Sequence, residues 1–538
     1  MKKRFAIPAV LGMLILCGCG RHGGEVAVTG IEPAAGSVDN GGRTDHSTGN
    51  LQEQGFGTSA LSLSAEAFYT EQTPGILVDE NGYDASAGKI AILCGDVLPA
   101  SFEVREDATD AVVYTGEVRR MNAQDEGLQV AVADFSDVKE SGTYYLSTQW
   151  LGESRVFDVL EDRDGTLMKE LLGRYYINRC GIALTEEYAG EHAHGVCHSG
   201  DAHLAEDPDK ALDVSGGWHM DEHADRFSAN GAQIVTNLLL AYEMNQAAFG
   251  DDTGIPESGN GDPDVLDECR IEIEWLMKMQ DPRTGGIYAA ALTTGAAGGN
   301  LSNAPVEVQP ATPEATIHAA AALAKFGYLY RRSDPELAKS ALRAADKAFT
   351  FYLHTTDTSD AAAYLAAAEL YRATGREEYA QVLEGFFESD GFYERAAGDE
   401  DLFMGSVTYL MTGQNVRVGV SNRLMNTLMR EAETYATNAK RSAFEGETDN
   451  EDDTETVQRL LHGMQLLAVC DHVSYSYEYT TLLSDQLHLL GGRNAGAQDY
   501  LSGFAGKTGK EDYPGIVNQP VENAALTVAL AMIMQGGE

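Results

Sequence analysis

The pattern of apolar residues changes once along this chain of 538 residues, close to Asp162. Before that point, over residues 67–160, short runs of β-branched and aromatic residues are separated by turn signals such as Asn81-Gly82. After it, over residues 163–538, apolar residues recur at helical spacing. This single switch predicts a multidomain chain, with an all-β domain followed by an all-α domain.

The β-rich segment has the dimensions of a small sandwich. It contains about seven short apolar runs within some ninety residues, and this density is typical of an immunoglobulin-like fold. We therefore expect an immunoglobulin-like domain over residues 67–160.

The second segment predicts about twelve helices. Several begin at marked positions, since Asp262-Pro263, Thr312-Pro313 and Asp334-Pro335 each place a capping residue before a proline. Consecutive helical hairpins that close into an (α/α)6 barrel would account for this number. The expected helices span 163–179, 229–249, 263–280, 313–332, 335–354, 360–374, 376–388, 402–413, 419–439, 454–473, 475–490 and 520–535.

The first residues have the features of a targeting segment. Lys2, Lys3 and Arg4 precede the apolar run 5–16, and the run ends at a lipobox-like Leu-Cys-Gly-Cys. We expect residues 1–18 to be a lipoprotein signal peptide and Cys19 to carry the lipid; a plain secretory signal is the alternative. Residues 19–66 are rich in Gly, Ser, Thr and Asn and are expected to be a flexible linker. This interpretation places the protein outside the cytoplasm, on the cell surface, attached to the membrane by a lipid anchor.

The charge of the chain excludes one class of partner. The formal net charge is −45, and so acidic a protein repels phosphate backbones, so we expect no nucleic-acid partner. The acidic run 445–455 could bind calcium, but it lacks ordered ligand spacing, which favours a solvated loop. Calcium therefore stays an alternative cofactor, at sites that the sequence does not identify. Five of the seven cysteines lie beyond Cys19, and an odd number argues against a disulfide framework.

Several stretches resemble one enzyme family. The helical part contains DVSGGW, IPESGNG, PDVLDE and LLGGRNAGAQDYLSGF, and the β-rich part contains ILVDENGY and ADFSDVKESGTYYL. These stretches closely resemble glycoside hydrolase family 9, the cellulases that carry an N-terminal immunoglobulin-like domain. The resemblance implies an (α/α)6 barrel with a cleft for β-1,4-glucan, which is hydrolysed with inversion. Inversion requires a base and an acid, two carboxyl groups roughly 6.5–9.5 Å apart.

The expected catalytic positions do not carry the family's residues. In that family an Asp-Ala-Gly-Asp run directly follows a Gly-Gly-Trp-aromatic or Gly-Gly-Trp-His segment and supplies the base, whereas here Met220 and His223 occupy the two aspartate positions. The family's acid, a glutamate before the last helix, falls on Gln519. Asp221 and Glu222 are candidate catalytic residues because their carboxylates lie inside this segment. His223 is a third candidate, because a neutral imidazole can accept a proton. Trp218 is the candidate for binding sugar.

Four residues have the chemistry of a zinc site. Cys180, the adjacent pair Cys197-His198, and His219 supply two thiolates and two imidazoles, a tetrahedral zinc set. The family resemblance implies a structural zinc in these same segments. A Cys180–Cys197 disulfide and unlinked buried cysteines are the alternatives.

Two functions follow from the sequence. The first is a cellulase-like glycoside hydrolase that acts on β-glucan or a related polysaccharide. The second is a surface lipoprotein that binds a glycan or a protein partner in the same cleft without hydrolysis.

Overall fold

The computed structural model describes residues 75–125, 128–200, 202–295, 301–356, 360–446, 453–504 and 512–536. The expected signal peptide, the linker and Cys19 lie outside these ranges, as does the middle of the acidic run 445–455. Within the described ranges, no helix has both the length and the apolar character needed to cross a membrane.

The β-rich segment forms a nine-stranded arrangement in the described residues, ordered β1-β3-β6-β5-β4-β7-β9-β2, with β8 paired to β7. The strand β5 is shared: its first half pairs with β4 and its second half with β6. The strands are β1 Ile76–Leu77, β2 Tyr83–Asp84, β3 Ile90–Gly95, β4 Ser101–Glu106, β5 Val112–Asp125, β6 Leu128–Asp134, β7 Gly142–Thr148, β8 Gly152–Glu153 and β9 Phe157–Leu160.

Alternation along the strands gives this domain two buried surfaces. In β3, Ala91 and Leu93 pack with Phe102 and Phe157 in the core between the two halves, which confirms the predicted sandwich. Their neighbours on β3, such as Ile92, belong instead to the apolar core shared with the helical domain. Successive side chains of a strand point to opposite faces, so one face of the sandwich is covered by helices.

Each expected helix is present, and its start differs from the expectation by at most two residues. The long helices are α2 Arg163–Ile177, α4 Ser228–Met244, α5 Asp264–Lys278, α6 Pro313–Leu329, α7 Pro335–Thr355, α8 Ala361–Thr374, α9 Glu377–Phe387, α11 Glu400–Met411, α12 Val418–Ala439, α13 Asp453–Val473, α14 Tyr477–Leu490 and α15 Pro520–Gly536. Short turns of helix were not expected from the sequence: α3 Glu186–Ala189, α10 Phe392–Arg395, η1 Gly190–His192, η2 Gln246–Ala248 and η3 Ile516–Asn518.

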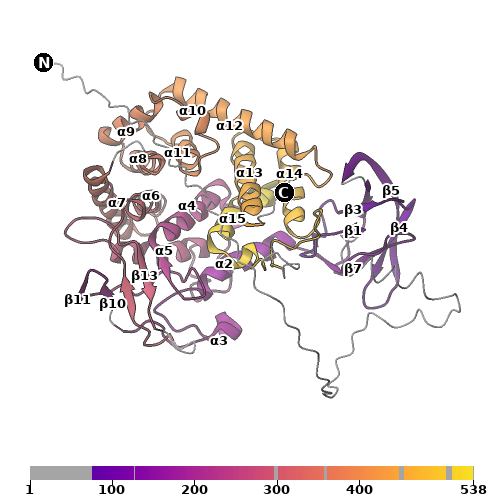
Figure 1. Ribbon diagram of the computed structural model, residues 1–538, viewed down its shortest axis with the longest axis horizontal. Coiled ribbons are helices and arrows are strands. Elements are labelled where there is room, and N and C mark those ends of the chain that lie inside the picture. Colours follow the sequence, from indigo (N-terminus) through magenta and orange to yellow (C-terminus); the bar gives the residue numbers. More distant parts are fainter. Residues whose placement is uncertain are drawn as a thin grey trace, which may run out of the picture. The chain divides into compact units, whose positions relative to one another are not determined.

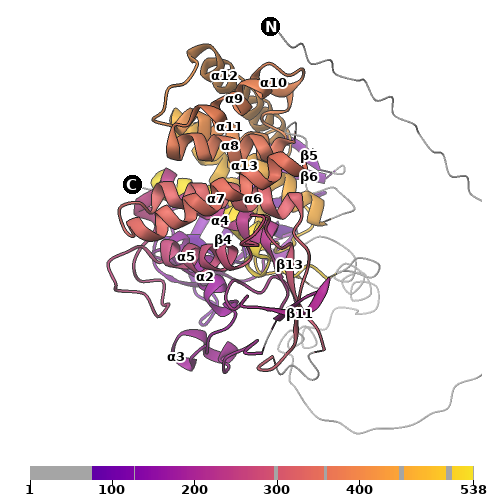
Figure 2. The same ribbon diagram turned by 90° about the vertical axis from the view of Figure 1, so that its left-hand side faces the viewer.

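The helices form an inner and an outer ring. Contacts link α4 to α6, α6 to α8 and α8 to α11, and they also link α13 to α15 and α15 to α4. His462 of α13 closes the ring, since its Nε2 lies 2.7 Å from the Ala397 carbonyl beside α11. The remaining long helices pack outside, as α7 does beside α6 (Figures 1 and 2). Because consecutive helices reverse direction, the inner helices all begin at one end of the barrel.

A small five-stranded sheet was also missed from the sequence. Its order is β11-β10-β14-β13-β12, and it lies at the margin of the barrel (Figure 1). Its strands are β10 Ala202–Leu204, β11 Asp207–Leu212, β12 Arg226–Phe227, β13 Ala290–Thr293 and β14 Val306–Val308. The strand β12 runs directly into α4, so this sheet fixes the loop that precedes the inner ring.

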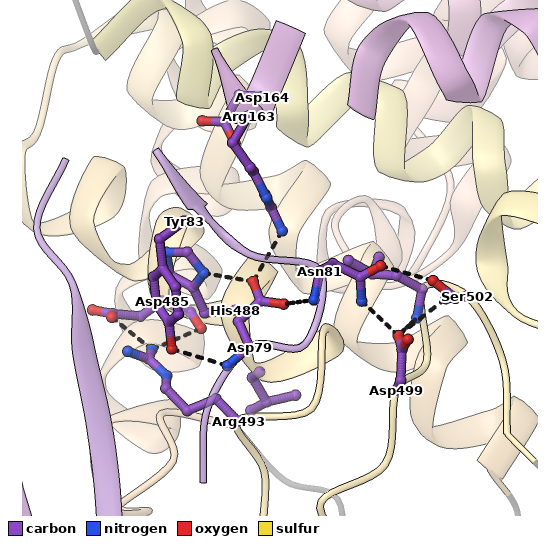
Figure 3. A network of polar contacts seen from close by, with 12 residues as sticks. Asp79, Asn81, Tyr83, Arg163, Asp164, Asp485, His488, Arg493, Asp499 and Ser502 are labelled. Carbon is purple, nitrogen blue, oxygen red and sulfur yellow. Dashed lines mark hydrogen bonds and ion pairs between the residues drawn. The ribbon is translucent and has the colours of Figure 1, made fainter. Parts of the chain in front are cut away.

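A buried polar network joins the two domains (Figure 3). Asp79 is fully buried, and its Oδ2 accepts hydrogen bonds from Arg163 Nη2 at 2.9 Å and from His488 Nδ1 at 2.7 Å. The Asn81 side chain bonds Asp499, and Ser502 donates back to Asn81 at 2.7 Å. Charges in an apolar interior are tolerated when paired, so the network fixes the register between the sandwich and α2 and α14.

Candidate functional site

The segment 213–227 carries most of the predicted site residues and lies immediately before α4. It contains two adjacent glycines, Gly216 and Gly217, that no other residue could replace easily. Gly216 and Gly217 have φ values of 107° and 76°, and a Cβ on Gly217 would lie 2.7 Å from the Trp275 ring. The Gly-Gly pair therefore lets the backbone turn against Trp275.

Trp218 is fully buried, so the prediction that it binds sugar is wrong. Its indole Nε1 donates to Glu268 at 3.3 Å, and its backbone N donates to Glu272 at 3.0 Å. Both glutamates lie on α5. The tryptophan therefore anchors the loop to this helix and presents no surface to a ligand.

The motifs IPESGNG and PDVLDE have a common physical role. Buried Arg179 forms ion pairs with Glu257 at 3.0 Å and Glu268 at 2.8 Å, and so connects the two motifs to the end of α2. Asp264 accepts hydrogen bonds from Thr253 and Ser258, which closes the turn between them. These residues build the frame around the 213–227 segment.

The structure brings together the four predicted metal ligands, Cys180, Cys197, His198 and His219. All four are buried, and one ligand atom from each lies within 4.8 Å of the others. Cys180 Sγ is 3.3 Å from His198 Nδ1, and Cys197 Sγ is 3.8 Å from His219 Nε2. Zinc bound to sulfur and nitrogen in a tetrahedron separates its ligands by roughly 3.3–3.8 Å, so the donor set fits this ion.

The alternative of a disulfide is not realised. The two Sγ atoms lie 3.9 Å apart, far beyond an S–S bond of about 2.05 Å. The hydrogen bond from Cys180 lowers the pKa of the Cys197 thiol, which makes Cys197 the thiolate of the pair. Burial lowers the pKa of His219 and keeps its imidazole neutral, the form that binds a metal.

A second set of contacts orients these ligands. His198 Nε2 lies 3.1 Å from Thr293 Oγ1, and Gly181 N donates to Cys197 Sγ at 3.2 Å. The backbone N of His219 donates to the Asn178 carbonyl at 2.8 Å. Such contacts fix ligand orientation before a metal binds, so the site is preorganised.

Directly after His219, the loop 220–225 presents the candidate catalytic residues. Asp221 Oδ1 accepts hydrogen bonds from the backbone N of His223 at 3.0 Å and of Asp225 at 2.9 Å. The Glu222 side chain is 87% exposed and the His223 side chain 70% exposed, 3.7 Å apart. Of the three, only Asp221 has a side chain held in place by bonds to the loop.

The remaining predicted positions offer little acid–base chemistry. Met220 packs partly into the apolar core. Gln519 lies between η3 and α15, where its amide contacts the Gly515 carbonyl at 3.5 Å. Glu522, the nearest carboxylate along the chain, lies in the first turn of α15. Its side chain accepts a hydrogen bond from Gln458 of α13.

A polar cluster at the mouth of the barrel was not identified from the sequence. His318 Nε2 pairs with Asp401 at 3.2 Å, and Gln233 donates to Glu400 at 2.6 Å. Together with Leu365 these side chains line one small pocket between α4, α6, α8 and α11. Each of these residues lies in the first turns of an inner helix, and the inner helices all begin at the same end of the barrel. This shared position is the sequence signal that could have indicated the cluster.

Comparisons with known proteins agree with the geometry. The family model described as glycosyl hydrolase family 9 matches residues 165–527, and the cellulase N-terminal ig-like domain matches residues 71–153. Endoglucanase D of Acetivibrio thermocellus is 29% identical over 448 residues, which cover 75% of this chain and 69% of that protein. A cellodextrinase of Butyrivibrio fibrisolvens is 32% identical over 214 residues, 38% of each chain.

Solved structures share the fold. A metagenome-derived family 9 endoglucanase superposes with a TM-score of 0.74 at 22% identity, covering 85% of this chain and 98% of that one. A family 9 protein of Bacteroides ovatus has a TM-score of 0.70 at 19% identity, covering 86% of this chain and 100% of that one. The sandwich and the barrel thus occur together elsewhere.

Proposed function

Because the chain belongs to glycosyl hydrolase family 9, we propose that it is a cellulase-like hydrolase in which Asp221 is the base. The observation that carries this proposal is the pair of backbone N–H groups that hold Asp221 on the loop after Gly-Gly-Trp-His. A positioned carboxylate can take a proton from a water molecule. The relatives named as endoglucanases support β-1,4-glucan or a related polysaccharide as the substrate class.

At the family's acid position this chain carries Gln519. In an inverting reaction the base takes a proton from the attacking water, while an acid protonates the oxygen that leaves. The Gln519 amide cannot supply that proton. Turnover should therefore depend on the leaving group: a sugar hydroxyl leaves slowly without protonation, whereas a nitrophenolate leaves without it.

Hydrolysis of two substrates tests this mechanism. We expect the purified protein to release dinitrophenol from dinitrophenyl β-cellobioside and to release reducing sugar from mixed-linkage glucan far more slowly. The variant Asp221→Asn keeps the acceptor oxygen for the loop but loses the base, so its rate on the aryl substrate should fall by roughly 10²–10⁴-fold. Glu222→Gln, on the same loop, is the control and should keep its rate.

Loss of turnover in Glu222→Gln but not in Asp221→Asn would assign the base to Glu222. The same test on His223→Gln examines the imidazole. If the unmodified protein releases nothing from either substrate, the hydrolase proposal is wrong.

A second candidate function is binding of glycan without hydrolysis. Met220 and Gln519, which carry no acid or base, favour it. Retardation of an inactive protein by β-glucan in an affinity gel would support this function. Absence of retardation, together with measured turnover, would contradict it.

We also propose that the four-ligand cluster holds a structural zinc. Zinc there would supply a neutral cross-link, and two thiolates with two imidazoles leave no open position for a water molecule. Metal analysis should find about one zinc per chain, and Cys197→Ser should remove it and lower the thermal midpoint. Cys470→Ser, a buried cysteine of α13 outside the cluster, is the control and should retain the metal.

We also propose that the protein is extracytoplasmic and lipid-anchored, because the residues ending at Cys19 resemble a lipobox. Expression in a bacterium with labelled fatty acid should label the protein, and Cys19→Ala should abolish the label and release the protein in soluble form. An unlabelled, secreted wild-type protein would instead favour the plain secretory signal.

A further inference from the structure

A cavity of about 430 Å³ opens beside the metal cluster, on the side of the small sheet. Its walls come from the segment 196–200, from Ala202 and Ala211 of the β10–β11 hairpin, from the segment 212–215 and from Val306 of β14. A volume of several hundred Å³ is typical of pockets for small molecules. Neither Asp221 nor Gln519 contributes to the lining, so this cavity is distinct from the candidate catalytic loop.

Arg226 of β12 lines this cavity and is only 1% exposed. Its Nη1 donates to the carbonyls of Val214 at 2.6 Å and Gly216 at 2.9 Å. Its Nε is buried without a hydrogen-bond partner. Within the described ranges, its Nη2 forms no hydrogen bond and no carboxylate forms an ion pair with the guanidinium, so Nη2 is the nitrogen that can meet a ligand. A buried cation without a counter-ion is costly, so the guanidinium has unused capacity to bind an anion.

The groups around Arg226 do not neutralise it. Burial raises the pKa of Glu272 to about 8, so this neighbouring carboxyl group is uncharged at neutral pH. Asp213, which also lines the cavity, is paired with Lys278 at 3.4 Å and is 71% exposed. Two thiolates balance a bound zinc ion, so the loaded metal cluster carries no net charge toward Arg226.

We propose that this cavity binds an oxyanion, the carboxylate or sulfate group of a sugar-sized molecule, against Arg226. The planar guanidinium matches the geometry of such groups and forms charge-assisted hydrogen bonds with them. Ser199 Oγ lines the same cavity and donates its proton to the Ser302 carbonyl at 2.6 Å, so this oxygen can accept a hydrogen bond from a hydroxyl of the ligand. The site binds its ligand independently of hydrolysis on the 220–225 loop.

Calorimetric titration of the zinc-bearing protein tests the site, with sodium glucuronate and sodium sulfate as ligands at constant ionic strength. We expect one anion site per chain and no binding of glucose there. Arg226→Met should weaken anion binding roughly tenfold to a hundredfold. Ala211 lies at an exposed position on β11. Ala211→Phe should fill part of the cavity and weaken anion binding by a similar factor, while the guanidinium and the zinc content stay unchanged.

The variants separate the outcomes. If Arg226→Met does not fold, Ala211→Phe decides, and unchanged binding in Ala211→Phe would overturn the proposal. Absence of binding by either anion would also overturn it. Tighter binding of glucuronate than of sulfate supports a sugar acid as the ligand. Binding of sulfate alone would show that the site takes only a free inorganic anion and would overturn the proposal of a sugar-sized ligand. Asp221→Asn should bind as the wild type does, so failure of the hydrolase proposal leaves this result unaffected.

Discussion

His318 belongs to the polar cluster at the mouth of the barrel, and its charge state depends on its partner Asp401. Burial opposes its charge, but the hydrogen bond and the attraction of Asp401 outweigh burial and raise the pKa of His318 to about 9. A histidine in the unfolded chain titrates near 6.5. The folded state therefore binds this proton more tightly than the unfolded state does, and the pair stabilises the fold only while the proton is bound.

This linkage predicts a pH dependence of stability. The contribution of His318 should be complete below about pH 6.5 and should disappear as the pH rises through about 9. Urea unfolding should show His318→Gln less stable than the wild type by up to about 3 kcal/mol at pH 6 and equal to it at pH 10. His203→Gln, at an exposed position on β10, is the control. A difference that grows toward high pH would contradict the assignment.

At the scale of elements, local signals in the sequence were sufficient for the helices. Thr312 and Asp334 cap α6 and α7 through their side chains, as the capping residues before proline predict. Asp262 does not act in this way, because α5 begins one residue later, at Asp264. The small sheet and the networks of Arg179 and Asp79 could not be predicted, because their partners lie up to hundreds of residues apart and no local pattern encodes the pairing.

The same reasoning applies to the metal cluster and the catalytic loop. Residue chemistry and family resemblance identified the four ligands, whose convergence only the structure shows. The predicted sugar-binding role of Trp218 was wrong, because the sequence does not show whether a single aromatic side chain is buried or exposed. Arg226 was overlooked because an isolated arginine in sequence is most often a surface residue.

The glycine pair before α4 gives a prediction at this scale. Gly217→Ala should destabilise the protein by more than about 1 kcal/mol, since φ is 76° and the new methyl group would meet the Trp275 ring. It should also reduce zinc retention, because Cys180 N bonds the Gly217 carbonyl at 2.8 Å. Gly385→Ala in α9, where a Cβ meets nothing within 4 Å, should be neutral or stabilising in thermal unfolding. Equal effects of the two substitutions would contradict this explanation.

For the whole molecule, the Asp79 network predicts cooperative unfolding. Asp79→Ala leaves Arg163 and His488 buried beside an empty position, and loss of one partner of a buried ion pair typically costs about 3–5 kcal/mol. We expect urea unfolding of the variant to separate into two transitions, whereas the wild type shows one. Asp137→Ala, an exposed site of the same sandwich, should leave a single transition. A single, unshifted transition in Asp79→Ala would show that the network does not couple the domains.

The sandwich face that carries Ile92 and Val132 has a consequence for gene rearrangement. A recombination event that moved residues 75–160 into another protein would uncover this apolar surface, and the helical part would lose the cover over α2. Exposed apolar surface of this kind promotes aggregation. Natural selection should therefore preserve the two parts as one inherited unit even where the catalytic residues diverge, and either part produced without the other should be insoluble.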